Sequence, residues 1–341
     1  MKSTAAWILW FISTLVFLLS TRNPLYLVST SVGLLILGWW LSPTLKRGHW
    51  LKQNLQFLSI IILVSSLINS LFTHSGKTMI LTIPDSWPLI GGIITVESLV
   101  YGAINGLIIG CLFLLFNDLN LALSIKQLTS LIPRAFYPIA MIVTIALTFF
   151  PFIQRRFVEI KEAQMIRGNP MKKFSDWMPL LVPLLVSSLE NGLTLSESMT
   201  SRGFYTAKQE DNSILHVVAL ILGTFLVFSG WILSIYDYST IIFLPLIFLG
   251  VFIIVFTLWR LGSAVKTTKY HHEELNRQDI LAIGIMILLI CVTIFFIWSD
   301  KLNSLDYSPY PSLSMPTFEI IPMLLSLLPI LPLTLTHHDK N

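Results

Sequence analysis

The sequence predicts an all-α polytopic membrane protein with about eight transmembrane helices and a cytoplasmic module of long helices. Of its 341 residues, 54% are hydrophobic and only 12% are charged, about half the usual charged share of a soluble domain. Several apolar runs reach the roughly 20 residues that a helix needs to cross a bilayer. The charged residues are concentrated in one stretch, 117–213, between two groups of apolar runs.

Eight apolar runs are the predicted spans. The first begins shortly after Lys2 and could pass for a signal peptide, but no small-x-small cleavage site follows it. We therefore predict an uncleaved first span. The predicted spans cover about 5–20, 25–42, 55–72, 96–116, 214–235, 240–260, 278–298 and 319–336.

A further apolar run, 137–153, decides the predicted topology. If it stays out of the bilayer, all but three of the 22 Lys and Arg residues face the cytoplasm; the exceptions are Arg22, Lys77 and Lys301. If it crosses, only seven of the 22 face inward. Because Lys and Arg collect in cytoplasmic loops, the first topology is favoured. The run is then the apolar first half of a helix, 137–167, that continues into the cytoplasm.

This topology divides the chain into three parts. Residues 1–116 form a four-span membrane domain, 117–213 a cytoplasmic or interfacial helical module, and 214–336 the C-terminal spans. The N-terminus, the module and the C-terminus are expected in the cytoplasm of a multi-pass cell-membrane protein.

The helical module carries a repeated pattern. "EAQMIRG" begins at Glu162 and Ala163 and ends at Arg167 and Gly168. "ESMTSRG" repeats it 35 residues later, from Glu197 and Ser198 through Ser201 to Arg202 and Gly203. We predict that each copy ends a long helix, the second of which covers about 171–202.

Two interpretations of these ends are open. A Gly just past a helix end is a common left-handed stop, and a basic residue suits the last turn. Two matched ends on consecutive helices also suit docking, because an Arg guanidinium offers several directional donors and Gly permits close backbone approach. Two ends predict two grooves on soluble cytoplasmic partners.

Longer stretches carry a family resemblance. They are "NPLYLVST" (23–30), "LINSLFTHSGKTMILTIP" (67–84), "GGIITVESLVYGAINGLIIG" (91–110), "FPFIQRRFVEIKEAQMIRG" (150–168) and "VPLLVSSLENGLTLSESMTSRGF" (182–204). Together they resemble the transmembrane T component of energy-coupling factor (ECF) transporters, the cobalt and vitamin uptake type of the ABC superfamily, over roughly 1–235.

The resemblance implies a function. In that family two coupling helices end in Ala-Arg-Gly-type motifs that sit in grooves of two ABC-type ATPases. The T component also holds a small membrane S component that binds a vitamin or a metal ion. On this basis the implied docking residues are Arg167, Gly168, Arg202 and Gly203, with Glu162, Ala163, Glu197 and Ser201 beside them.

This chain departs from the family pattern in two ways. Ile166 and Ser201 stand where the family has Ala, and the chain continues beyond the family core through 240–336. We predict that this extension is peripheral to coupling. The substrate is not specified by this chain, because the S component would select it.

The remaining ionisable residues give weaker signals. Glu97 and Asp118 flank the fourth span; we expect helix-end residues at the interface, with a role in a transport pathway as the alternative. Glu190 lies within the second long helix, where it either lines the seam between the two helices or is a partly exposed residue. His74 and Glu97 supply too few ligands for a metal site, and the "HHEEL" stretch at 271–275 is expected to be solvated.

No catalytic, metal-binding or cofactor-binding constellation is present in the sequence. It lacks a phosphate-binding GxxxxGK[ST] loop, so any ATP hydrolysis belongs to partner subunits. HExxH and GxSxG are absent as well, which argues against an enzyme, and nothing points to nucleic acid. The alternative is a self-contained secondary transporter, whose usual midplane charges are nearly missing here.

Overall fold

The protein is described from a computed structural model, over residues 3–73, 75–83, 92–168, 177–203, 213–236, 240–264, 277–298 and 304–336. Its elements form two compact units, which are treated separately below. The first contains residues 1–128 and 270–341, and the second contains residues 129–269. The predicted segments 1–116, 117–213 and 214–336 follow chain order, whereas the contacts join the two ends of the chain in one unit.

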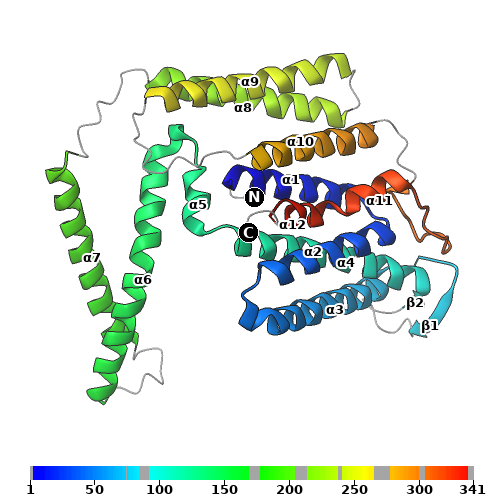
Figure 1. The fold of residues 1–341 in the computed structure, drawn as a ribbon, viewed down its shortest axis with the longest axis horizontal. Helices are drawn as coiled ribbons and strands as arrows, with labels where there is room; N and C mark the ends of the chain where they lie inside the picture. The colour runs from blue at the N-terminus through cyan, green and yellow to red at the C-terminus, as the bar shows by residue number, and fades with distance from the viewer. Residues whose placement is uncertain are drawn as a thin grey trace. The chain divides into compact units, whose positions relative to one another are not determined.

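The first unit is built from helices at both ends of the chain (Figure 1). Its elements are α1 (Thr4–Ser20), α2 (Pro24–Leu41), η1 (Thr44–Lys46), α3 (Arg47–Phe72), β1 (Met79–Ile83), β2 (Gly92–Thr95), α4 (Val96–Ala122), α5 (Ile125–Ser130, at the boundary), α10 (Arg277–Trp298), α11 (Ile320–Ser326), η5 (Leu328–Ile330) and α12 (Leu331–Thr336). The two strands pair antiparallel as a hairpin.

The start of α2 follows from two residues. Pro24 occupies the first turn, where its missing N–H costs nothing. Asn23 caps the helix by accepting a hydrogen bond from the Leu25 N–H at 3.0 Å. The sequence "NP" therefore begins α2, shortly after α1 ends at Ser20.

Close packing of α3 and α4 depends on small residues. A Cβ on Gly102 or Gly106 would lie 2.7 Å from a backbone Cα of α3, at Ser66 and Ile62 respectively. Ser65 Oγ also donates to the Gly102 carbonyl at 2.8 Å. Glycine on α4 thus lets the two helix backbones approach, as in other membrane helix pairs.

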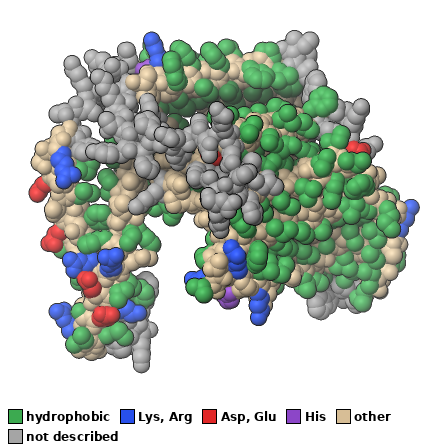
Figure 2. All heavy atoms as spheres, in the orientation of Figure 1, with side chains coloured by type: hydrophobic (Ala, Val, Ile, Leu, Met, Phe, Trp, Pro, Cys, Tyr) green, Lys and Arg blue, Asp and Glu red, His purple; other side chains and the backbone are tan. Residues whose placement is uncertain are grey.

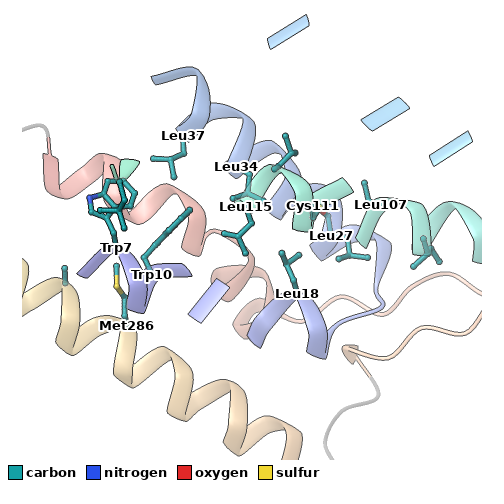
Figure 3. Packing of buried hydrophobic residues seen from close by; sticks show 14 of the residues in the cluster. Trp7, Trp10, Leu18, Leu27, Leu34, Leu37, Leu107, Cys111, Leu115 and Met286 are labelled. Atoms are coloured by element: carbon teal, nitrogen blue, oxygen red, sulfur yellow. The ribbon is translucent and has the colours of Figure 1, made fainter. Parts of the chain in front are cut away.

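The core of the first unit combines α1, α2, α4 and α10. Figure 3 shows Trp7, Trp10 and Met286 meeting between α1 and α10, with Leu34 and Leu115 packed further along the cluster. Trp10 and Met286 are completely buried. An element near the C-terminus therefore supplies part of the core that surrounds the first helix.

The segment after α10 is also fixed to the N-terminal helices. Asn23 Nδ2 donates to the carbonyls of Ser304 and Thr317, both at 2.8 Å. Tyr26 Oη accepts from the Glu319 N–H at 2.8 Å. These bonds connect positions almost 300 residues apart in the sequence.

The predicted span 319–336 is broken into α11, η5 and α12, because Pro329 and Pro332 cannot donate ladder hydrogen bonds. That the extension is peripheral to coupling stays a prediction. The extension does form part of the core of the first unit: Ala282 and Met286 are fully buried, and Leu325 and Leu328 are nearly so. Removing it would expose the apolar surface that it covers on α1 and α2.

The second unit contains η2 (Arg134–Phe136), α6 (Tyr137–Ile166), α7 (Met178–Ser201), α8 (Ser213–Ile235) and α9 (Thr240–Ala264). Helices α8 and α9 pack along their length through facing glycines. A Cβ on Gly250 would meet the Gly223 carbonyl at 2.7 Å, and one on Gly230 would meet the Ile247 side chain at 2.6 Å.

Seven of the described helices are long and apolar enough to cross a membrane. They include α2, α3, α4, α8 and α9, which match predicted spans, while α1 and α10 are shorter apolar helices at two other predicted positions. The prediction of an all-α polytopic membrane fold is therefore confirmed. Helices α6 and α7 also meet the criterion, so their predicted position outside the bilayer stays a prediction.

Candidate functional site

Helix α6 ends at the first Arg-Gly pair, as predicted. Its last helical residue is Ile166, and the Arg167 N–H still donates to the Ala163 carbonyl at 3.2 Å. Gly168 has φ +81°, a left-handed value that L side chains rarely adopt, and its N–H donates to the Met165 carbonyl at 3.1 Å. No described atom lies within 4 Å of the position that a Gly168 Cβ would take.

Helix α7 ends in the same way. Its last residue is Ser201, and Arg202 again occupies the cap. The Arg202 N–H donates to the Met199 carbonyl at 3.2 Å, and Gly203 has φ +75°. The sequence repeat is thus a repeat of helix-end geometry, with an Arg immediately before a left-handed Gly in both copies.

The two helices pack against each other in antiparallel orientation (Figure 1). Gln164, near the end of α6, donates from Nε2 to the carbonyl of Pro179, near the start of α7, at 3.2 Å. Further along, an open groove of about 410 Å³ between the helices has as its lining residues Thr148, Phe149, Phe152, Asn191, Thr194, Leu195 and Ser198. The antiparallel arrangement carries the two Arg-Gly ends to opposite ends of the pair.

The separation of the two ends follows from helix geometry. The first end lies one turn from Gln164, which contacts Pro179. From Pro179, helix α7 runs to Arg202, a length of roughly 35 Å at about 1.5 Å per residue. The two ends are therefore separated by about the length of α7.

Most of the surface of α6 and α7 is left uncovered by the described chain. Leu180 is the buried residue of α7, and the described part of α6 buries none. Exposed apolar residues on α7 include Leu185 at 61% and Leu189 at 67%. Lys, Arg, Asp and Glu side chains also collect on this pair, as Figure 2 shows. Such a mixed surface suits contact with a protein partner or with the polar edge of a bilayer.

The two helix ends differ in chemistry. Before Arg167 stand Met165 and Ile166, which are 57% and 88% exposed. Before Arg202 stands Ser201, whose hydroxyl donates back to the Ser198 carbonyl at 2.9 Å. The first end therefore presents apolar surface, and the second presents small polar residues held against the helix.

The other predicted residues of this region are also exposed. Glu162, Ala163 and Glu197 lie on the helix surfaces close to the ends. Glu190 is exposed, and the neighbouring Asn191 lines the groove between α6 and α7. The polar groove residues of α7 were not singled out from the sequence. Their signal was weak: Asn191, Thr194 and Ser198 recur at intervals of three and four residues, which places them on one helix face.

The two acids of α4 lie near its two ends, as expected, but both are covered by the protein; their position at the membrane interface stays a prediction. Glu97 and Asp118 are both completely buried. Glu97 Oε1 accepts from the Thr78 N–H at 3.0 Å and the Thr78 hydroxyl at 2.8 Å, and thereby ties the hairpin to α4. Neither acid belongs to a cluster of metal-binding side chains among the described residues. His74 and the stretch 271–275 lie outside the described residues.

Comparison with known proteins supports the resemblance. The profile of CbiQ, described as "Cobalt transport protein", matches residues 2–214. The chain is 29% identical over 202 residues to the "Energy-coupling factor transporter transmembrane protein EcfT" of Bacillus selenitireducens, covering 56% of this chain and 73% of that protein. It is 25% identical over 194 residues to the EcfT of Macrococcus caseolyticus, covering 51% and 69%.

A third relative gives the same result. The EcfT of Acidaminococcus fermentans is 29% identical over 187 residues, covering 50% of this chain and 66% of that protein. The matched profile includes both Arg-Gly helix ends and stops at the start of α8. The extension α9–α12 lies beyond it. The relatives are transporter membrane subunits rather than enzymes. This chain therefore belongs to the CbiQ cobalt transport protein family, as a transmembrane T component of the energy-coupling factor transporter class.

Proposed function

We propose that the chain is the coupling subunit of an ECF-type importer. Its helices α6 and α7 would dock two cytoplasmic ABC-type ATPases and pass their motion to a small substrate-binding S component, which takes up a vitamin or a metal ion. The observation that carries the proposal is the pair of Arg-Gly ends, which lie at opposite ends of one antiparallel helix pair.

The geometry fits two separate grooves. Each Arg is followed by a Gly with positive φ, and because Gly has no side chain, a groove wall can approach the backbone there. Charge-assisted hydrogen bonds from each Arg contribute roughly 1.5–3 kcal/mol. The exposed surface of α6 and α7 leaves room for partner contacts along the rest of each helix.

The docking proposal is tested by reversing both charges. The double substitution Arg167→Glu and Arg202→Glu should release the ATPases or uncouple hydrolysis from uptake, while single Ala substitutions should give partial loss. The measurement is co-purification of a co-expressed ATPase pair, together with substrate uptake. Lys161→Glu is the matched control, because Lys161 is an exposed basic residue on α6 that precedes Arg167 by six positions and is not part of the Arg-Gly end.

Two results would contradict docking at these ends. One is full ATPase recovery and uptake in the double variant, which would leave both pairs as ordinary helix stops. The other is equal loss in the Lys161→Glu control, which would make net charge the cause. Solute transport in liposomes by the purified chain alone would instead favour a self-contained secondary transporter.

The proposal includes a topology in which the N-terminus, the α6–α7 pair and the C-terminus are cytoplasmic. It rests on the placement of Lys and Arg in the sequence. In a background without Cys111 and Cys291, Val158→Cys on α6 should be shielded from membrane-impermeant thiol reagents in intact cells and labelled after permeabilisation. Labelling from outside would mean that the first half of α6 crosses the membrane.

A further inference from the structure

The carboxyl group of Asp118 is a buried polar group that the coupling proposal does not use. Asp118 lies one turn before the end of α4 and is completely buried. Neither Oδ1 nor Oδ2 has a hydrogen-bond partner among the described residues. A buried acid in a membrane helix normally finds a donor or a cation, so this arrangement needs an explanation.

The space around Asp118 is closed by two other helices. Gly38 of α2 lies directly against it, and a Cβ at Gly38 would overlap both Asp118 Oδ1 and the Trp50 ring of α3. Glycine at this position therefore creates the gap that the carboxyl and the indole share. The Trp50 Nε1–H is buried there too and has no described partner.

No described cation neutralises the carboxylate. Helices α1 and α2, which pack on α4, contain no charged residue. On α3 the Arg47 guanidinium donates to the carbonyls of Ser42 and Trp40, both at 3.3 Å, and lies 4.9 Å from the Trp39 ring centre. The other ionisable side chains at that end of α3 are exposed, and they are Lys46, His49 and Lys52.

The remaining described neighbours do not neutralise the Asp118 carboxylate either. Asn117, the residue before Asp118, donates from Nδ2 to Asn54 Oδ1 at 2.9 Å, and Asn54 Nδ2 donates to the Trp50 carbonyl at 2.8 Å. These amides are therefore committed to each other and to the backbone. Asp279 of α10, a helix that packs on α1, is another buried acid and adds no positive charge.

Burying an ionised carboxylate without a partner is costly, and such groups bind a proton instead. We propose that Asp118 is a proton-binding site at the junction of α2, α3 and α4, and that its carboxyl group carries a proton in the packing described here. Gly38 and Trp50 cover the carboxyl, so opening of the junction there would admit water to it. Loss of the proton is therefore linked to separation of α2 from α3 and α4 at this end.

Glu97, at the other end of the same helix, is the natural comparison. It is equally buried, but its carboxylate accepts hydrogen bonds from the Thr78 hydroxyl and from the N–H groups of Lys77 and Thr78. Those donors stabilise the ionised form. Helix α4 thus holds one buried acid with donors and one for which the described part of the chain supplies none.

Infrared spectroscopy of the purified full-length protein tests the proposal directly. At neutral pH the wild type should show the C=O stretching band of a protonated carboxyl group. Asp118→Asn should remove the band, and Glu97→Gln should leave it in place. A wild type without the band, or an Asp118→Asn variant that retains it, would overturn the proposal.

Two further measurements guard against a variant that fails to fold. In wild-type protein, ¹³C labelling of aspartate side-chain carboxyls should shift the band, and the same labelling of glutamate should not; the reverse pattern would contradict the assignment. The unfolding midpoint of the wild type should also fall relative to Asp118→Asn from neutral to alkaline pH, because only the unfolded state releases the proton freely. Parallel midpoints would contradict a bound proton.

Discussion

The first unit and the α6–α7 pair use their apolar residues in different ways. Helix α4 buries eleven residues, whereas the described part of α6 buries none although it is longer by three residues. Both helices are rich in large apolar residues, mainly Leu in α4 and Ile and Phe in α6. The difference teaches that apolar content alone does not identify an internal core: the first unit completes its packing within the chain, and α6 and α7 leave theirs for a partner or for lipid.

The largest expected effect is the loss of the C-terminal extension. Truncation after Ala264 removes α10–α12, including the buried residues Ala282 and Met286 and the carbonyls that bind Asn23. We expect the first unit to lose its fold, measured as aggregation in size-exclusion chromatography and as a lost unfolding transition. Co-expression of residues 265–341 as a separate chain should restore part of this unfolding transition. A truncated chain with the wild-type midpoint would contradict the shared core.

Two glycine substitutions compare the units at the level of one methyl group. Gly106→Ala places a Cβ 2.7 Å from the Ile62 Cα, so α3 and α4 must separate, at a cost of about 1–3 kcal/mol. Gly192→Ala on α7 meets no described atom within 4 Å and removes a helix-weakening residue, worth up to about 1 kcal/mol. Thermal unfolding of both variants measures the contrast. Equal shifts of the same sign in the two unfolding midpoints would contradict this difference between the units.

A smaller effect is expected at the left-handed helix stop. Gly168→Ala places a residue with a Cβ at φ +81°, which should destabilise the end of α6 by about 1–2 kcal/mol. Hydrogen exchange should accelerate in the last turn of α6, while the unfolding midpoint of the first unit stays unchanged. Gly168→Asn should lose less, because Asn tolerates this conformation better. Identical exchange in all three proteins would show that the stop does not hold the helix end.

The smallest effect is expected at the ion pair on α6. Arg156 Nη1 lies 2.9 Å from Glu159 Oε2, and the two side chains are 48% and 60% exposed. Exposed pairs of this spacing contribute no more than about 0.5 kcal/mol. Glu159→Gln should therefore leave the unfolding midpoint equal to that of the wild type within error. The control is the wild type in high salt, which screens the same ion pair. A clear shift would mean that the pair is buried against a partner.

Local sequence patterns were sufficient for the helix ends and for most helix positions. The Gly after Arg167 and the Gly after Arg202 mark both stops correctly, because a left-handed residue there is a local requirement of the chain. The "NP" before Leu25 marks the start of α2, because an Asn cap and a Pro in the first turn are also local requirements of the chain. The helix predicted after 319 is broken because Pro329 and Pro332 lack the N–H that a continuous helix requires, and its apolar length alone does not show this.

Contacts between distant segments were not predictable in this way. Nothing near Asn23 indicates that its amide binds carbonyls of Ser304 and Thr317, and nothing near Asp118 indicates that Gly38 and Trp50 close around it. The two acids of α4 looked alike as span-edge residues. Their different surroundings come from segments that neither local periodicity nor composition brings together.

The sequence by itself determined that this is a helical membrane protein with two matched Arg-Gly helix ends, because apolar run length, charge placement and glycine stops are properties of short stretches of chain. The tertiary structure decided that α6 and α7 run antiparallel and carry those ends apart, that α10–α12 complete the core around α1 and α2, and that Asp118 is buried without a donor among the described residues. These features depend on which surfaces meet across long sequence separations, and that depends on the shape and packing of whole helices.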